Sequence, residues 1–343
     1  MMRLLLFLTQ MGVALITAAP AAADARFAAA AELSRKSGGI AMLVMLDGKV
    51  VFEDYPNGGA PTRATELASG TKSFSGILAL CAVEDGWLKL DEKIADTLTE
   101  WRDDPQRSDI TVRQLLTLTS GIPGGESALR TGGVPKYAEA VAVEAVAEPG
   151  KRFSYGPNPF QVFGEFLRRK LAPRGETVWQ YLSRRILQPL GLESMRWRGS
   201  ALGQPQLPSG AGLSARDWAK FGESIRLDAK GILPPGKLAE CFIGTTANPG
   251  YGLTWWLPVK GQLGAIPRTV SGPWLPEQTW MAAGAGGQRL VVVPSLQLVA
   301  VRLAPVRGEN EAPFNDRNWL RALLEPVAAG PAKPAAPVGQ STP

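Results

Sequence analysis

Strand-like segments lie near both ends of this chain and enclose a long middle part with helical patterns. Residues 40–46 and 49–53 are joined by Asp47-Gly48, a two-residue turn typical of a β-hairpin. Further short strand-like runs follow the middle part, at residues 251–259, 279–282, 289–293 and 298–303. We therefore predict an α+β fold. Its antiparallel sheet is built from both chain ends and flanked by helices, and an inserted all-helical subdomain spans about residues 84–245.

Helix start signals recur through the middle part. Thr111 and Thr177 each stand three residues before a glutamine, which is the spacing of a capping box. These two signals predict helices over residues 112–119 and 181–187.

Three further helices are expected. Ser214, with Asp217 in the first turn, predicts a helix that ends at Gly231. Residues 25–35 and 313–328 form the first and last predicted helices. The last helix places four large apolar residues on one side, namely Trp319, Leu320, Leu323 and Leu324.

The first residues have the three parts of a secretory signal peptide. Arg3 gives a basic start, an apolar run covers residues 4–16, and small residues end at Ala23. We predict export with cleavage near Ala23, to the bacterial periplasm or outside the cell, with an uncleaved anchor as the alternative. The apolar run is too short to span a bilayer comfortably, and no later stretch reaches that length. Stable membrane insertion after cleavage is therefore not expected.

The predicted organisation has three parts. A signal peptide covers residues 1–23, a globular domain covers residues 24–328, and a Pro/Ala-rich tail covers residues 329–343. The composition of the tail gives it too few large apolar residues to fold, so we predict that it is disordered.

The absence of histidine from all 343 residues excludes several kinds of chemistry. A Ser-His-Asp triad, histidine-based zinc sites and histidine general bases are impossible, and the GxSxG and P-loop motifs are also absent. The net charge of +6 is spread along the chain without a dense run of Lys or Arg, which argues against a nucleic-acid partner. We therefore expect no metal, no cofactor and no nucleic acid.

The two cysteines, Cys81 and Cys241, leave two possibilities open. They could form a disulfide in an oxidising compartment or remain free thiols. Cys81 shares the apolar face of a predicted helix with Phe74, Ile77 and Leu78. This position favours a buried free thiol.

Ser69 and Lys72 stand three residues apart, where a helix running to Glu84 is predicted to begin. Side chains at i and i+3 share one face of a helix, so the Lys72 amine can reach the Ser69 hydroxyl. The helix N-terminus adds a positive field, and burial of the lysine would ease formation of its neutral amine. Both effects suit a serine nucleophile with lysine as its activator. The alternative is a Ser/Thr-rich helix start with a solvated lysine.

Several short blocks occur in a fixed order along the chain, at residues 69–74, 84–86, 90–91, 111–116 and 119–121. Together they resemble the serine β-lactamase superfamily, which also includes D,D-peptidases, family VIII esterases and aminohexanoate-oligomer hydrolases. The resemblance covers about residues 35–325 and implies a catalytic domain of the β-lactamase/transpeptidase type over residues 24–328. Blocks in a fixed order are more specific than the Ser-x-x-Lys tetrad alone, so they favour a catalytic Ser69 and Lys72.

The second element of that family is a tyrosine followed two residues later by asparagine. Tyr155 matches the tyrosine, and Pro157 stands where the asparagine is usual. Asn158 comes one place late, so the resemblance implies substrate binding by Asn158 only if its amide turns inward. For Tyr155 the resemblance implies a share in acid–base catalysis, and the alternative is a core aromatic residue that covers a loop.

The third element of the family is a Lys- or His-containing triad that ends in glycine, on a strand at the edge of the cleft. Residues 282–284 match it, with alanine in place of the cation. The resemblance implies that the amides of Ser69 and Ala285 form an oxyanion hole, and that Gly284 lets the backbone approach the substrate. The alternative for residues 284–287 is a flexible connection between strands.

These residues predict an exported serine hydrolase that cleaves an ester or amide of a small molecule or peptide. Ser69 forms an acyl-enzyme, Lys72 and Tyr155 share the general base and acid roles, and water releases the product. Ala282 and the block 283–288 look closer to esterases and aminohexanoate-oligomer hydrolases than to true β-lactamases. A D,D-peptidase or β-lactamase is the first alternative, and a catalytically impaired binding protein on the same fold is the second. No oligomeric state is predicted.

Overall fold

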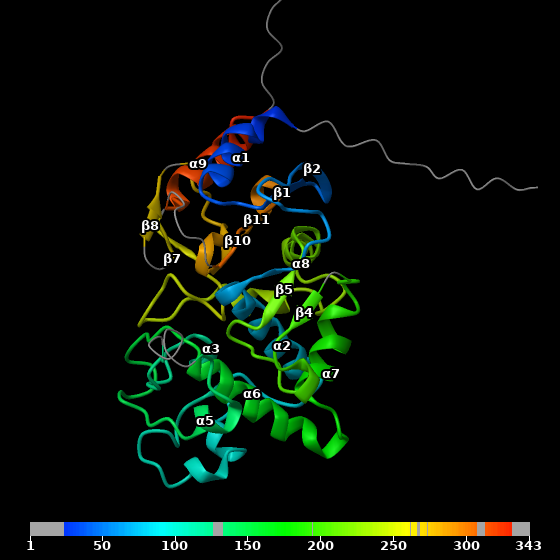
Figure 1. Cartoon of the computed structure of the whole chain (residues 1–343). Coiled ribbons are helices and arrows are strands. Elements are labelled where there is room, and N and C mark those ends of the chain that lie inside the picture. Colours follow the sequence, from blue (N-terminus) through cyan, green and yellow to red (C-terminus); the bar gives the residue numbers. More distant parts are fainter. Residues whose placement is uncertain are drawn as a thin grey trace, which may run out of the picture.

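The computed structural model of the chain (Figure 1) describes residues 24–125, 133–193, 195–260, 262–265, 268–272, 274–306 and 313–330. The predicted signal peptide at residues 1–23 and nearly all of the predicted tail at residues 329–343 lie outside these residues. None of the helices in the described part of the chain is long and apolar enough to cross a membrane.

A five-stranded antiparallel sheet draws its strands from both ends of the chain (Figure 1). Its order is β2-β1-β11-β10-β9, with β1 (Ala41–Leu46), β2 (Lys49–Asp54), β9 (Trp280–Gly284), β10 (Gln288–Val293) and β11 (Leu298–Leu303). β1 pairs with β11 along its full length, from Ala41 opposite Leu303 to Leu46 opposite Leu298. The predicted α+β fold, with a sheet assembled from both chain ends, is confirmed.

The predicted strand over residues 251–259 is wrong for most of its length. Tyr251 makes a single bridge to Trp256, and a strand, β6, forms at Pro258–Val259. Thr254 has a φ of 75°, so the backbone turns where an extended strand was expected. β6 starts a small three-stranded sheet with β7 (Gln262–Ala265) and β8 (Arg268–Ser271).

Helices cover both faces of the central sheet. On one face, Arg302 of β11 donates a 2.7 Å hydrogen bond to the carbonyl oxygen of Ser37, at the end of α1. On the other face, Gly222 lets α8 lie close to the sheet, because a Cβ there would be 2.6 Å from a methyl carbon of Leu290 and 2.7 Å from one of Val299. The covering helices are α1 (Ala28–Lys36), α8 (Ala215–Arg226) and α9 (Asp316–Ala328).

The four apolar residues predicted on one side of the last helix are fully buried in α9. Figure 1 shows α9 beside α1, above the sheet in this view. The first and last α-helices of the described residues thus pack against each other.

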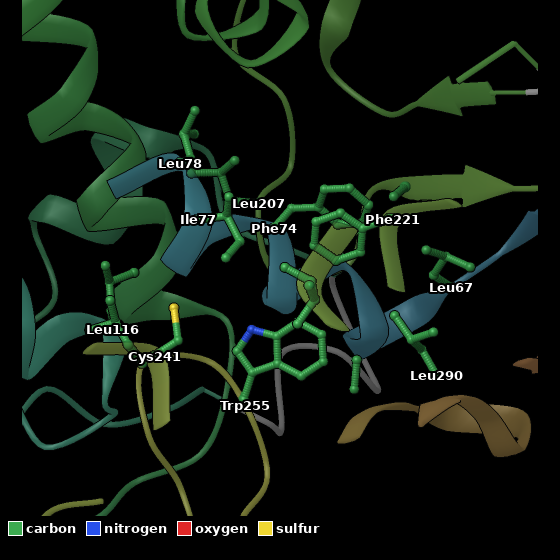
Figure 2. Close-up of a cluster of buried hydrophobic side chains, with 14 of the residues drawn as sticks. Leu67, Phe74, Ile77, Leu78, Leu116, Leu207, Phe221, Cys241, Trp255 and Leu290 are labelled. Atoms are coloured by element: carbon green, nitrogen blue, oxygen red, sulfur yellow. The ribbon is translucent and has the colours of Figure 1, made fainter. Parts of the chain in front are cut away.

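The other half of the molecule is built around α2 (Ser73–Glu84). Every residue from Ser73 to Ala82 is buried, so this helix is enclosed on all sides and lacks a solvent face. Figure 2 shows its side chains among residues from distant segments, which include Leu116, Leu207, Phe221, Cys241 and Trp255. The packing explains why apolar residues surround the helix instead of forming the predicted single stripe.

The remaining helices of the described residues are mostly short. The α-helices are α3 (Val112–Leu116), α5 (Tyr137–Val141), α6 (Asn158–Leu171) and α7 (Val178–Leu182). Short 3-10 segments are η1 (Ala25–Phe27), η2 (Ala68–Lys72), η3 (Ile94–Asp96), η4 (Thr99–Trp101), η5 (Ala172–Arg174), η7 (Ser200–Leu202), η8 (Lys237–Phe242), η9 (Ala285–Gly287) and η10 (Pro294–Leu296). The stretch 84–245 also holds two short strands, β4 (Met195–Trp197) and β5 (Ala211–Leu213), which form a sheet of order β3-β5-β4 with β3 (Thr65–Glu66).

The three predicted helix caps agree with the structure. The side chains of Thr111 and Thr177 each accept a hydrogen bond from the backbone N–H of the glutamine three residues later, and both capping boxes are complete. Ser214 caps α8 in the same way by accepting from Asp217. The helix that Thr177 starts continues beyond α7 as one π-helical turn, η6 (Ser183–Leu187).

Two predicted helix ends are wrong. α3 ends at Leu116, because Leu118 has a φ of 61° and the chain leaves the helix there. α8 ends at Arg226, well before Gly231, because Asp228 has a φ of 59°. Left-handed residues of this kind end a helix wherever they occur, and a non-glycine sequence gives little sign of them.

Candidate active site

Ser69 lies in η2, a 3-10 turn, and not in the first turn of an α-helix as predicted. A 3-10 helix has three residues per turn, so residues i and i+3 lie directly above one another. Lys72 Nζ accordingly lies 3.0 Å from Ser69 Oγ. Ala68 has a φ of 46°, a left-handed conformation that is uncommon for a residue with a Cβ. Backbone strain of this kind is concentrated at functional sites.

Lys72 is buried, with 2% of its surface exposed. Its amine donates one hydrogen bond to Ser69 Oγ and another, of 3.0 Å, to the carbonyl oxygen of Pro208. The same nitrogen lies 4.9 Å from the centre of the Tyr155 ring and 5.3 Å from that of Phe160. The alternative of a solvated lysine is therefore wrong.

Tyr155 lies in the loop before α6 and is half-buried beside the Lys72 amine. Its ring centre is 5.7 Å from that of Trp256 and 6.3 Å from that of Tyr251, so aromatic rings hold it in place. Burial raises the pKa of the neighbouring Tyr251 hydroxyl well above its ordinary value, and Tyr251 stays neutral. The structure thus brings Ser69, Lys72 and Tyr155 together, as predicted from the sequence.

Asn158 is hydrogen-bonded to the neighbouring loop at residues 123–124. Its side-chain amide donates a 3.0 Å hydrogen bond to the carbonyl oxygen of Pro123, and its backbone N–H donates to that of Gly124. Gly125, with a φ of 80°, leaves room for this side chain, because a Cβ there would be 2.6 Å from the amide nitrogen. Asn158 is not among the described residues that line the cavity at Ser69.

Gly284 brings the edge strand β9 next to the Ser69 turn. A Cβ at Gly284 would overlap the carbonyl oxygen of Leu67 and lie 3.0 Å from the amide nitrogen of Gly70, so glycine is required here. Ala285 follows and lines the same cavity as Ser69. The connection after Gly284 is a defined turn, η9, in which Gly286 and Gly287 have φ of 79° and 78°. The alternative prediction for this segment was a flexible connection between strands.

Ala282 of the third element and the nearby Arg289 are both buried. Ala282 is 3% exposed and contributes no charge to the site. Arg289, the nearest cation in sequence, is 5% exposed and forms two hydrogen bonds with the carboxylate of Asp316, of 2.6 and 2.7 Å. It also donates a 3.0 Å hydrogen bond to the carbonyl oxygen of Gly284, so Arg289 supports the backbone of β9.

A cavity of about 800 Å³ opens beside Ser69. It lies between the Ser69 turn, η9, the strands β3 and β4, and the loop at Gly133. Its polar and charged lining among the described residues consists of Arg63, Thr65, Glu66, Ser69, Arg196, Arg198 and Ser209.

The sequence prediction missed the arginines of this cavity. Arg196 and Arg198 flank the buried Trp197, and alternate residues of a strand point to the same face, so strand spacing could have placed both on one side. Arg63 has no comparable signal, because it lies in a loop whose course depends on the rest of the fold.

The described residues contain no group of three or more His, Cys, Asp or Glu side chains that could hold a metal ion. Cys81 and Cys241 are both free and buried, so the alternative of a disulfide is wrong. Burial raises the pKa of the Cys81 thiol to about 12, and it stays protonated and unreactive.

The fold, with the Ser69–Lys72 pair beside its cavity, is that of the β-lactamase-like proteins. Residues 16–324 match the family model described as Beta-lactamase, and the chain belongs to this family. The family resemblance predicted from the sequence blocks is confirmed.

Several known proteins are similar to this chain. Protein flp of Staphylococcus aureus (strain MW2) is 25% identical over 171 residues, which cover 45% of this chain and 34% of flp, so the match spans about a third of that relative. A candidate 6-aminohexanoate-dimer hydrolase from Bacillus anthracis superposes with a TM-score of 0.70 at 18% identity, covering 87% of this chain and 81% of the other. EstCE1, described as a hydrolase with promiscuous acyltransferase activity, has a TM-score of 0.68 at 18% identity and covers 89% and 97% of the two chains. At these identities the two structures show a shared fold.

Proposed function

We propose that this protein is an exported hydrolase that cleaves an ester or amide through an acyl-enzyme on Ser69. The observation that carries the proposal is the buried amine of Lys72, 3.0 Å from Ser69 Oγ and 4.9 Å from the centre of the Tyr155 ring. A basic group at hydrogen-bond distance from a hydroxyl can take its proton as the oxygen attacks. The chain has no histidine, so lysine and tyrosine fill this role.

The proposed reaction has two halves that use the same groups. The Ser69 oxygen bonds to the carbonyl carbon of the substrate, and its proton passes to the Lys72–Tyr155 pair. The amides of Ser69 and Ala285 hold the oxyanion, in agreement with the position of both residues on one cavity. The alcohol or amine then leaves with the proton from the pair. A water molecule then attacks the acyl-enzyme by the same steps, and the acid is released from Ser69.

Ala282 favours an ester or amide over a β-lactam or a D-Ala-D-Ala terminus. In related enzymes the cation of the third element can pair with a carboxylate of such substrates, whereas Ala282 is neutral and buried.

Export is proposed from the signal-like residues 1–23. N-terminal sequencing of the protein from a periplasmic or culture fraction should find Asp24 at the start. An intact N-terminus in the cytoplasmic fraction would contradict this part of the proposal.

Labelling with a fluorophosphonate probe, together with hydrolysis of 4-nitrophenyl butyrate, tests the nucleophile. The wild-type protein should be labelled and active, and Ser69→Ala should lose both properties while melting like the wild type. Ser209→Ala is the matched control, because Ser209 lines the same cavity, and it should keep both. Labelling of Ser69→Ala would show that another residue reacts, and an unlabelled, inactive wild type would favour a binding protein on the same fold.

A further inference from the structure

The cavity beside Ser69 has a positively charged wall. Among the described residues that line it, three are arginines, Arg63, Arg196 and Arg198, and one is an acid, Glu66. Glu66 forms an ion pair with Arg198. A positive excess of charge therefore remains on this wall, next to the candidate nucleophile.

The arginine wall is fixed relative to the Ser69 turn. Leu67 donates a 2.9 Å hydrogen bond to the carbonyl oxygen of Ala211 in β5, and the Ala211 amide donates to Thr71 Oγ1 at 3.2 Å. β5 in turn pairs with β4, where Ala211 stands opposite Trp197. These bonds connect the turn that holds Ser69 to the strand that holds Arg196, so the fold fixes the backbone of Arg196 relative to Ser69.

The arginines retain donors for a ligand. Arg196 lies across Gly212, where a Cβ would be 3.0 Å from its Cγ and Nε, and donates one hydrogen bond of 3.1 Å to the carbonyl oxygen of Ala64. A guanidinium carries five N–H donors, and the bond to Ala64 uses one of them. Arg196 and Arg198 are both exposed, so they can bind an anion without losing a buried contact.

The position of the general acid decides which part of the substrate meets this wall. Neither Lys72 nor Tyr155 is among the described residues that line the cavity. In the proposed reaction the leaving group must take its proton from that pair, so it lies on their side of Ser69. The cavity with the arginine wall, which Ser69 and Ala285 also line, is then left for the acyl part of the substrate.

We propose that the acyl part of the substrate ends in a carboxylate, and that Arg196 and Arg198 bind it while Ser69 attacks the carbonyl at the other end. Arginine binds carboxylates through two parallel N–H bonds, which suits a fixed acyl chain. This inference rests on the proposed function and names its substrate class as half-esters or half-amides of dicarboxylic acids.

The test compares two esters with the same leaving group and acyl chain length, 4-nitrophenyl hydrogen adipate and the uncharged 4-nitrophenyl hexanoate, after subtraction of spontaneous hydrolysis. Wild type should favour the acid ester in kcat/KM, and the double variant Arg196→Gln/Arg198→Gln should lower that preference about 10-fold, as expected for two exposed ion pairs. The loss should fall on KM, because the carboxylate lies away from the reacting carbonyl. Added salt should reduce the preference in the wild type.

Three further variants separate charge from structure. Arg196→Lys/Arg198→Lys keeps the charges and should keep part of the preference. Glu66→Gln removes the opposing acid and should increase the preference. Arg184→Gln is the matched control, because Arg184 is an exposed arginine that pairs with Glu176 and does not line this cavity, and it should change nothing.

The outcomes separate this inference from the proposed function. If the hexanoate ester is hydrolysed in a Ser69-dependent way and the arginine variants leave the ratio of the two esters unchanged, the inference is wrong and the proposed function stands. If the same variants instead affect an ester with a carboxylate on its leaving group, 4-carboxyphenyl hexanoate, the assignment to the acyl part is wrong. If neither ester is turned over, calorimetry of Ser69→Ala with the acid ester decides, and equal binding with and without the two arginines would overturn the proposal.

Discussion

At the scale of single residues, Lys72 has an unusual position for a lysine, because it is buried. A buried amine is costly unless it has hydrogen-bond partners or gives up its charge, and Lys72 has Ser69 Oγ and the Pro208 carbonyl oxygen as partners. The serine–lysine pair could be predicted because three residues of sequence determine its geometry. The Pro208 contact could not, because 136 residues separate the two partners.

Replacement of the proposed base groups should show that they act as a unit. Lys72→Ala and Tyr155→Phe are each expected to lower kcat for a 4-nitrophenyl ester about 100-fold or more, because each removes part of one proton-transfer path. The double variant should lose much less than the product of the two effects, which steady-state kinetics will measure. Tyr181→Phe is the matched control, since the Tyr181 hydroxyl bonds to Asp85, and it should keep the rate. Fully multiplicative losses would show independent roles.

Gly284→Ala should damage the site through its backbone. The added Cβ would overlap the carbonyl oxygen of Leu67, so β9 or the Ser69 turn must move. We expect a stability loss of about 1–3 kcal/mol and a fall in kcat of at least about 10-fold. Gly250→Ala is the control, because the nearest atom to its new Cβ is a side-chain oxygen of Asn248 at 3.3 Å. A Gly284→Ala protein with wild-type kcat would mean that this close approach has no part in catalysis.

At the scale of secondary-structure elements, features set by neighbouring residues could be predicted from the sequence, and features set by distant residues could not. Thr111 and Ser214 start their helices through hydrogen bonds to residues three positions away, which the sequence displays directly. The 3-10 turn at Ser69 is imposed by packing, and the spacing of apolar residues does not show it. The same spacing gives no sign of the left-handed backbone at Asp228. Arg196 in β4 and Arg198 just after it show only the alternation around Trp197, and a strand of three residues is a short signal.

The ion pair between β10 and α9 should be important for stability. Arg289 and Asp316 have side chains only 6% and 8% exposed, so removal of the acid would leave a buried arginine without its counter-charge. We expect Asp316→Asn to lower the free energy of unfolding by about 3–5 kcal/mol in urea titrations. Glu325→Gln, which removes an exposed ion pair with Arg321 in the same helix, should cost about 0.5 kcal/mol or less. Similar losses in the two variants would show that burial of the first pair has no special effect.

At the scale of the whole molecule, the sheet and the helical part meet where Ser69, Ala285 and the arginine wall surround one cavity. The assembly of the sheet from both ends could be predicted, because strand-like runs occur at both ends of the sequence. The shape and charge of the cavity could not, because its lining comes from segments between residues 40 and 306 that only the fold brings together.

The proposed preference for esters or amides follows from this arrangement. Wild-type kcat/KM for a neutral 4-nitrophenyl ester should exceed that for nitrocefin by about 10-fold or more, because no cation stands at position 282 to pair with the carboxylate of a β-lactam. Ala282→Lys is a poor way to restore that cation, since the position is 3% exposed. Nitrocefin hydrolysis as fast as ester hydrolysis would favour the β-lactamase or D,D-peptidase alternative.

The central place of β11 in the sheet sets an order for biosynthesis. β11 lies between β1 and β10, and among the strands of the described residues it is the last to be synthesised. By then Ser69, Lys72, Tyr155 and Ala285 have all been made, yet the first hairpin still lacks the neighbour that joins it to the rest of the sheet. Pairing across so long a stretch of chain is slow, because the loop must close before any contact forms. A nascent chain that stops short of Leu298 thus holds every proposed catalytic group but lacks the strand that joins the β1-β2 pair to the β10-β9 pair.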